Sequence, residues 1–137
     1  MANYFSSNFT LGILGGGQLG KMMLYETRKF DITTHVLDPS LEAPCRIACN
    51  HFTQGDLMDY DTVYTFGKKV DILTFEIEGV NIEALEALEK EGKKVYPSSK
   101  TLRNIQDKGV QKKFYDTHKI PTAPFSVFET IAKVKKA

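Results

Sequence analysis

A glycine-rich run near the start of the chain has the spacing of a phosphate-binding loop. Residues 15–20, Gly-Gly-Gly-Gln-Leu-Gly, satisfy the pattern G-x-G-x-x-G. In this pattern the first glycine permits a tight turn, the second lets the backbone approach an anion, and the third lets the following helix pack on the preceding strand. Backbone amides at a helix start have no partner within the helix and can hold a phosphate. The run therefore predicts an anion site, or, in the simpler interpretation, only a tight turn.

Three acidic residues further along the chain could act with this loop. Asp38 stands where dinucleotide-binding enzymes place the acid that binds a ribose hydroxyl, so the pattern alone suggests NAD. Pro39 follows it directly, however, and Asp-Pro at a strand end is also typical of a turn.

Glu76 and Glu78 follow an apolar strand in the run TFEIE, and alternation would place both on one side. Parallel sheets bind ligands at the edge where their strands end. A buried acid needs a partner there, whereas a strand that has already emerged into solvent by Glu76 would leave both acids without a role.

Strand and helix patterns alternate along the chain and would position these residues. Short apolar or β-branched runs predict strands, and runs with apolar residues at helical spacing predict helices. Such alternation is typical of an α/β fold with a Rossmann-like open parallel sheet, right-handed crossovers and helices on both faces. Residues 101–119 also have a helical pattern, and an extended stretch begins at Pro121. The expected strands are 9–14, 33–37, 51–54, 72–75 and 94–96, and the expected helices are 18–30, 59–69 and 82–91.

Composition excludes several classes of protein. The formal net charge is +1, so we expect no nucleic-acid partner, and no apolar run is long enough to predict a membrane span. The start MANYFSSNFT lacks the basic and apolar regions of a signal peptide, and Cys45 and Cys49 fit one face of a short helix or loop better than a disulfide framework. The histidines lie at no metal-ligand spacing, so we expect no metal site in this chain and a cytoplasmic location.

Several motifs, taken in order, carry a family resemblance. GILGGGQLGKMM, DPSLEAP, GDLMDYD, LTFEIEGV, YPSS, DKGVQKKF and IPTAPF occur in this order from Leu11 to about Phe128. Together they resemble the start of the 5-(carboxyamino)imidazole ribonucleotide synthase family of the ATP-grasp superfamily. The resemblance implies ATP-dependent carboxylation of aminoimidazole ribonucleotide by bicarbonate, with Mg²⁺ as cofactor. It also implies that the loop holds the substrate phosphate and no dinucleotide.

The same resemblance implies roles for individual residues. Gly17, Gln18 and Leu19 would contact the substrate phosphate, Glu76 would be the catalytic carboxylate facing the substrate, and Lys108 would contact the ATP phosphates. Glu78 is a weaker candidate.

The resemblance also predicts how the chain is organised. Residues 1–100 would form the pre-ATP-grasp domain, and residues 101–137 a linker helix and the beginning of an ATP-grasp domain. The magnesium ligands of the family lie beyond this segment, so we expect an inactive fragment of an enzyme that is a homodimer when complete.

Three alternatives stay open on the sequence. The formate-dependent glycinamide ribonucleotide transformylase has a similar loop, but that family tends to have Glu where this chain has Gln18. The glycine pattern with Asp38 also fits an NAD-binding Rossmann domain of an oxidoreductase. A non-catalytic binding module is the third possibility.

Overall fold

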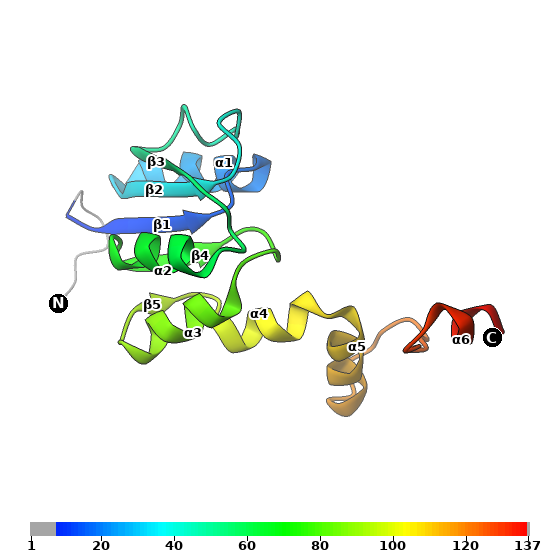
Figure 1. Ribbon diagram of the computed structural model, residues 1–137. Helices are drawn as coiled ribbons and strands as arrows, with labels where there is room; N and C mark the ends of the chain where they lie inside the picture. Colours follow the sequence, from blue (N-terminus) through cyan, green and yellow to red (C-terminus); the bar gives the residue numbers. More distant parts are fainter. Residues whose placement is uncertain (1–7, 137) are drawn as a thin grey trace. The chain divides into compact units, whose positions relative to one another are not determined.

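The computed structural model describes residues 8–136, so the polar leader in which we sought a signal peptide lies almost entirely outside the described residues. Within the chain two compact units are distinguished, one ending at Leu102 and the other beginning at Arg103. Each is described by itself below, with the elements labelled as in Figure 1. No helix among residues 8–136 is both long and apolar enough to cross a membrane.

The first unit is built on a five-stranded parallel sheet in the order β3-β2-β1-β4-β5, which confirms the expected α/β fold. The central strand β1 pairs with β2 on one side and with β4 on the other, and its Leu14 lies opposite Leu37 and Phe75. The strands are β1 (Thr10–Leu14), β2 (Thr33–Asp38), β3 (His51–Gln54), β4 (Ile72–Phe75) and β5 (Lys94–Val95).

Helices cover both faces of this sheet, as the alternation of strands and helices predicts (Figure 1). Because successive strand residues point to opposite faces, Ile13 packs with Leu24 of α1 (Gln18–Thr27) while Leu14 joins the cluster under α2 and α3. Helices α2 (Tyr60–Lys68) and α3 (Ile82–Lys90) begin at the N-caps Asp59 and Asn81, whose side chains accept the amides of Thr62 and Ala84.

Most expected elements differ from the structure by one residue at an end, and the first helix differs by three. The helix expected over 18–30 is α-helical only to Thr27 and continues as a 3₁₀ turn (Arg28–Phe30). This turn ends at Asp31, which adopts a left-handed conformation with φ 55°. The strand expected over 94–96 ends at Val95.

The helical pattern over 101–119 is broken near its middle. Helix α4 (Ser99–Gln106) ends before Asp107, and α5 (Lys108–Thr117) begins after it. The Asp107 carboxylate accepts the amides of Gly109 and Val110, so it starts a new helix inside the run that was expected to form a single one.

The second unit contains α5 and α6 (Ile131–Lys136), joined by the extended stretch that was expected from Pro121 onward. No residue of α5 or α6 is buried. Within this unit the Lys112 ammonium donates to the Thr122 hydroxyl at 2.5 Å and lies 5.8 Å from the centre of the Phe125 ring.

Candidate phosphate-binding loop

The glycine loop leaves the sheet at the carboxyl end of its central strand. Gly15 donates its amide to the Leu37 carbonyl at 2.9 Å, which extends the pairing of β1 with β2 by one residue. Its φ of 99° lies in the left-handed region that side chains disfavour, so glycine is required there. The strand order reverses between β1 and β4, and this reversal marks the point at which open α/β sheets bind ligands.

Two carboxylates from the neighbouring strands hold the loop. Gly16 donates its amide to Asp38 Oδ2 at 2.7 Å, and Gly17 donates its amide to Glu76 Oε1 at 2.9 Å. The strand register explains the convergence, because Leu14, Leu37 and Phe75 lie side by side and the next residue of each strand is Gly15, Asp38 or Glu76. The anion that the structure places at the Gly17 amide is therefore a side chain of the protein itself.

The glycines leave no space for side chains between these groups. A Cβ added at Gly17 would lie 2.9 Å from Glu76 Oε1, and one added at Gly20 would lie 3.0 Å from Cys45 Sγ and 3.0 Å from the Gly15 carbonyl oxygen. These separations are shorter than ordinary van der Waals contact. Close packing against the protein alone accounts for both glycines, and at Gly20 this is the helix–strand packing that the motif predicts.

Cys45 lies beneath the loop. Its amide donates to the Gly16 carbonyl at 3.0 Å, and its thiol lies 3.6 Å from the Gly17 carbonyl oxygen, to which it donates. Burial raises the pKa of this thiol to about 11, the negative charges of Glu76 and Asp38 add to the shift, and Lys21 opposes it. The thiol is therefore neutral near pH 7 and available as a donor.

The first turn of α1 offers the amides that an anion could use. Gly17 is the N-cap and has no side chain to accept them, and no acidic residue stands in the first turn. The amides of this turn have no acceptor within the helix, and the helix dipole favours negative charge here. Gln18 and Leu19 are exposed, with 63% of Leu19 accessible. The arrangement can hold a phosphate at Gln18 and Leu19, next to the carboxylate of Glu76.

The structure thus brings Gly17, Gln18, Leu19 and Glu76 together at the glycine loop of the first unit. Glu78 is exposed, because β4 ends at Phe75 and the strand alternation that would align it with Glu76 does not continue. Lys108 opens α5 in the second unit, where its ammonium donates to the Ile105 carbonyl at 3.3 Å. Among residues 8–136 no group of acidic, histidine or cysteine side chains is arranged to hold a metal ion.

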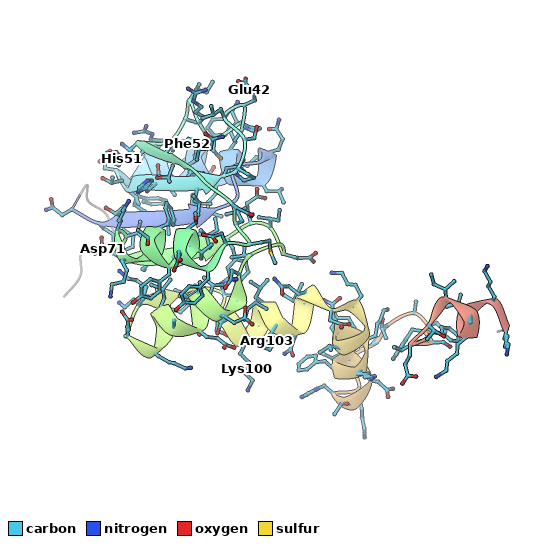
Figure 2. The ribbon with its side chains drawn as sticks, viewed as in Figure 1. Glu42, His51, Phe52, Asp71, Lys100 and Arg103 are labelled. Atoms are coloured by element: carbon cyan, nitrogen blue, oxygen red, sulfur yellow. The ribbon has the colours of Figure 1, made fainter. Side chains whose placement is uncertain are left out.

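The far end of the sheet shows a different use of an acid. Asp71 Oδ2 accepts the Thr10 amide at 2.8 Å. Figure 2 shows Asp71 and His51 at the edge where the strands begin. Glu42, in contrast, projects from the segment that follows β2. The carboxylates at the glycine loop therefore stand at the ligand-binding edge, and Asp71 stands at the opposite one.

Sequence reasoning missed the part played by Cys45. The cysteine was assigned to a helix or loop face, and the structure places it in a series of turns with both cysteines as free thiols. The residues needed to predict its contact lie 28 positions apart in the chain, and no spacing rule relates them.

Comparison with known proteins decides the family. A family model described as the ribonucleotide synthetase preATP-grasp domain matches residues 9–106. The chain belongs to this family. The preATP-grasp chain is similar to the N5-carboxyaminoimidazole ribonucleotide synthase of Staphylococcus aureus, with 31% identity over 93% of this chain and 34% of that protein.

Solved structures give the same picture. The carboxyaminoimidazole ribonucleotide synthase of Aspergillus clavatus, in complex with ATP, has a TM-score of 0.84 and 33% identity over 97% of this preATP-grasp chain and 35% of that one. A glycinamide transformylase T of Mycobacterium tuberculosis has a TM-score of 0.78 but only 18% identity, which shows a shared fold alone. The chain spans about a third of the length of these relatives.

Proposed function

We propose that this chain is the ribonucleotide-binding part of an ATP-dependent ligase that carboxylates 5-aminoimidazole ribonucleotide with bicarbonate. The observation that carries the proposal is the glycine loop: it lies at the switch point of a preATP-grasp sheet, its helix amides at Gln18 and Leu19 are open, and Glu76 stands beside them. ATP activates the bicarbonate in such a ligase, with ADP and phosphate released.

The residues have distinct parts in this proposal. The amides of Gln18 and Leu19 bind the phosphate of the ribonucleotide, and the Gly17 amide joins them only when Glu76 releases it. Glu76 can hold the loop through Oε1 while Oε2 accepts a hydrogen bond from the substrate. Lys108 contributes a positive charge to the ATP phosphates in the complete enzyme.

The remaining groups come from outside this segment. Mg²⁺ would be held by carboxylate ligands that the rest of the protein supplies and would offset the negative charge of the ATP phosphates, and the complete enzyme would be a homodimer. This division agrees with a chain that spans about a third of its relatives.

The alternative functions gain less support. An NAD-binding domain needs the acid after β2 for a ribose, whereas both Asp38 oxygens already accept backbone amides, from Gly16 and Ser40. For the transformylase, the one structural likeness shows the fold alone, and Gln18 stands where that family tends to have Glu.

A binding experiment on the chain tests the proposal. In a ¹⁵N-labelled sample, aminoimidazole ribonucleotide should shift the amide signals of Gln18 and Leu19, inorganic phosphate should compete, and NADH should leave these signals in place. Leu19→Asp places a negative charge in the first turn and should weaken binding at least tenfold. Tyr25→Asp, at another exposed position of α1 six residues further along, should not. Equal binding in both variants, or shifts with NADH alone, would contradict the proposed function.

A further inference from the structure

Asp38 is engaged by backbone amides on both of its carboxylate oxygens. Oδ2 accepts the Gly16 amide at 2.7 Å, and Oδ1 accepts the Ser40 amide at 2.8 Å. The second bond closes a turn, and the Ser40 carbonyl then accepts the Ala43 amide at 3.1 Å. The chain therefore folds back within a few residues and returns to the glycine loop at Cys45.

The two ends of this segment, residues 38–45, hold the same glycine. Asp38 takes the Gly16 amide, and the Cys45 amide donates to the Gly16 carbonyl at 3.0 Å. Ala43 packs between them, since a Cβ added at Gly16 would lie 3.1 Å from the Ala43 Cβ and 3.0 Å from the Asp38 Cβ. Both polar groups of Gly16 are thus fixed by the 38–45 segment.

Fixing Gly16 also sets the direction of the next residues. Gly17 follows directly as the N-cap of α1, and its carbonyl accepts the Cys45 thiol and the first helical amide bond, from Lys21 at 3.0 Å. The open amides of Gln18 and Leu19 come immediately after this fixed pair of glycines. Without the Asp38 bond, the buried Gly16 amide loses its acceptor and the loop must rearrange to satisfy it.

We propose that Asp38 is a positioning residue for ribonucleotide binding: it holds Gly16 so that the Gln18 and Leu19 amides point at the phosphate, and it does not contact the ligand. The inference rests on the proposed function and adds a residue to it. It gives a role in the loop to Asp38, the acid that the glycine pattern alone would relate to the ribose of NAD.

The direction in which the affinity for the ribonucleotide changes distinguishes a positioning role of Asp38 from a purely electrostatic one. Asp38 carries a negative charge close to the loop, so its removal should tighten phosphate binding if charge alone mattered. Positioning predicts the opposite, because a rearranged loop presents its amides poorly. Asp38→Asn removes the same charge but keeps one acceptor oxygen, so it should bind more tightly than Asp38→Ala.

Asp59 provides a matched control. Its carboxylate also accepts a backbone amide, that of Thr62 at 2.8 Å, but it caps α2 and has no contact with the loop. Asp59→Ala removes one charge and the acceptor of one amide, whereas Asp38→Ala removes one charge and the acceptors of two. The Asp59 variant reports the effect of losing a carboxylate that binds the backbone away from the loop.

The test measures two quantities in the wild type and these three variants of the chain: the dissociation constant for aminoimidazole ribonucleotide from ¹⁵N amide shifts, and hydrogen exchange at the Gly16 and Gly17 amides. We expect Asp38→Ala to weaken binding at least tenfold and to speed exchange at both glycines at least tenfold. Asp38→Asn should fall between it and the wild type, and Asp59→Ala should change neither quantity.

Tighter or unchanged ribonucleotide binding in Asp38→Ala would overturn the inference, and so would unchanged exchange at Gly16. A loss of binding equal to that of Asp59→Ala would overturn it too, because the effect would then be general. A wild-type chain that ignores the ribonucleotide would overturn the proposed function, and the exchange rates would still decide whether Asp38 positions the loop.

Discussion

Glu76 combines two roles that a substitution can separate. Oε1 accepts the Gly17 amide at 2.9 Å, while Oε2 accepts no hydrogen bond from the residues that the structure describes. Glutamine keeps one acceptor oxygen for the Gly17 amide but loses the charge and the second acceptor oxygen, whereas alanine loses all three. A matched pair of variants can therefore distinguish an effect on the substrate from an effect on the loop.

We predict that Glu76→Gln, in a complete enzyme that carries this segment, lowers turnover by one to three orders of magnitude, about 1.4 kcal/mol of transition-state stabilisation per tenfold. Glu76→Ala should lower turnover as much and should also raise the KM for the ribonucleotide. Steady-state kinetics measures both parameters. Glu78→Gln is the control, since Glu78 is exposed beyond the end of β4 and should leave turnover within about twofold. Wild-type kinetics in Glu76→Gln would show that Glu76 only holds the loop and takes no part in the reaction.

Because of Cys45, the free energy of unfolding should change with pH in the alkaline range. Its pKa in the folded chain is about 11, against about 9 for an unperturbed thiol, so the folded state keeps a proton that the unfolded state loses as the pH rises through 9. The contribution of this thiol is thus fully present below pH 9 and is lost between pH 9 and 11.

We predict that the free energy of unfolding falls across this interval and that Cys45→Ala makes the fall shallower. Urea unfolding at pH 8, 9 and 10 measures it, and the slopes rather than the absolute values are compared, because alanine also leaves a small cavity. Tyr60→Phe, which removes the hydroxyl of an exposed side chain, should leave the slope unchanged. Equal slopes in the wild type and Cys45→Ala would show that the thiol is not held neutral by the fold.

From the sequence, the glycine loop and Glu76 could be predicted to lie close together. Each directly follows a predicted strand, and parallel strands end at a common edge of the sheet. The sequence did not reveal that Asp38 and Glu76 accept the loop amides. That outcome depends on the register between β1, β2 and β4, which aligns Gly15 with both acids, and a single sequence does not specify register between strands that are distant in the chain.

Element by element, periodicity predicted the presence of the strands and helices better than their ends. The sequence predicts one helix over residues 101–119, yet the structure starts a second helix after Asp107 because the aspartate side chain binds the amides that follow it. The helix expected over 18–30 changes to a 3₁₀ turn after Thr27, and the left-handed Asp31 ends that turn at Phe30. Neither end could be read from the spacing of apolar residues.

Gly67 sets how closely α2 and α3 approach. It is buried in α2, and a Cβ added there would overlap the Leu88 side chain of α3, with Leu88 Cδ2 only 3.1 Å away. In an exposed helix, Gly→Ala stabilises by about 1 kcal/mol. Here the overlap should outweigh that gain.

We therefore predict that Gly67→Ala destabilises the chain by about 1–3 kcal/mol, measured by urea unfolding. The same substitution in a Leu88→Ala background should be neutral or stabilising, because the overlap has been removed. A double-mutant cycle gives the coupling between the two positions. Additive effects would mean that the helices can separate without cost and that the close approach is not required.

On the scale of the whole molecule, the two units differ in how they bury apolar residues. Both clusters of the core lie within the first unit, around the sheet. In the second unit the helices α5 and α6 contain no buried residue, and large apolar side chains stay exposed: Val110, Phe114, Ile120, Phe125, Val127, Phe128, Ile131 and Val134. The described residues of this unit therefore form no core of their own.

We predict that the purified 137-residue chain folds but hydrolyses ATP no faster than background. Folding follows from the two clusters that cover both faces of the sheet, and it is checked by a cooperative urea transition followed by circular dichroism. Inactivity follows from the chemistry of phosphoryl transfer, which needs magnesium ligands and several cationic groups around the transferred phosphoryl.

The described residues supply little of that machinery. No group of acidic, histidine or cysteine side chains among residues 8–136 is arranged for a metal, and Lys108 is the one lysine to which the proposed function gives a part in binding the ATP phosphates. A single ammonium cannot neutralise the charge that develops on a transferring phosphoryl group. The measurement is phosphate release with ATP, Mg²⁺, bicarbonate and aminoimidazole ribonucleotide, run beside a complete carboxyaminoimidazole ribonucleotide synthase as the positive control. Turnover by the chain that depends on bicarbonate and disappears in Glu76→Gln would show that the residues of this chain suffice for the reaction. The proposal that the remaining catalytic groups come from outside this segment would then be wrong.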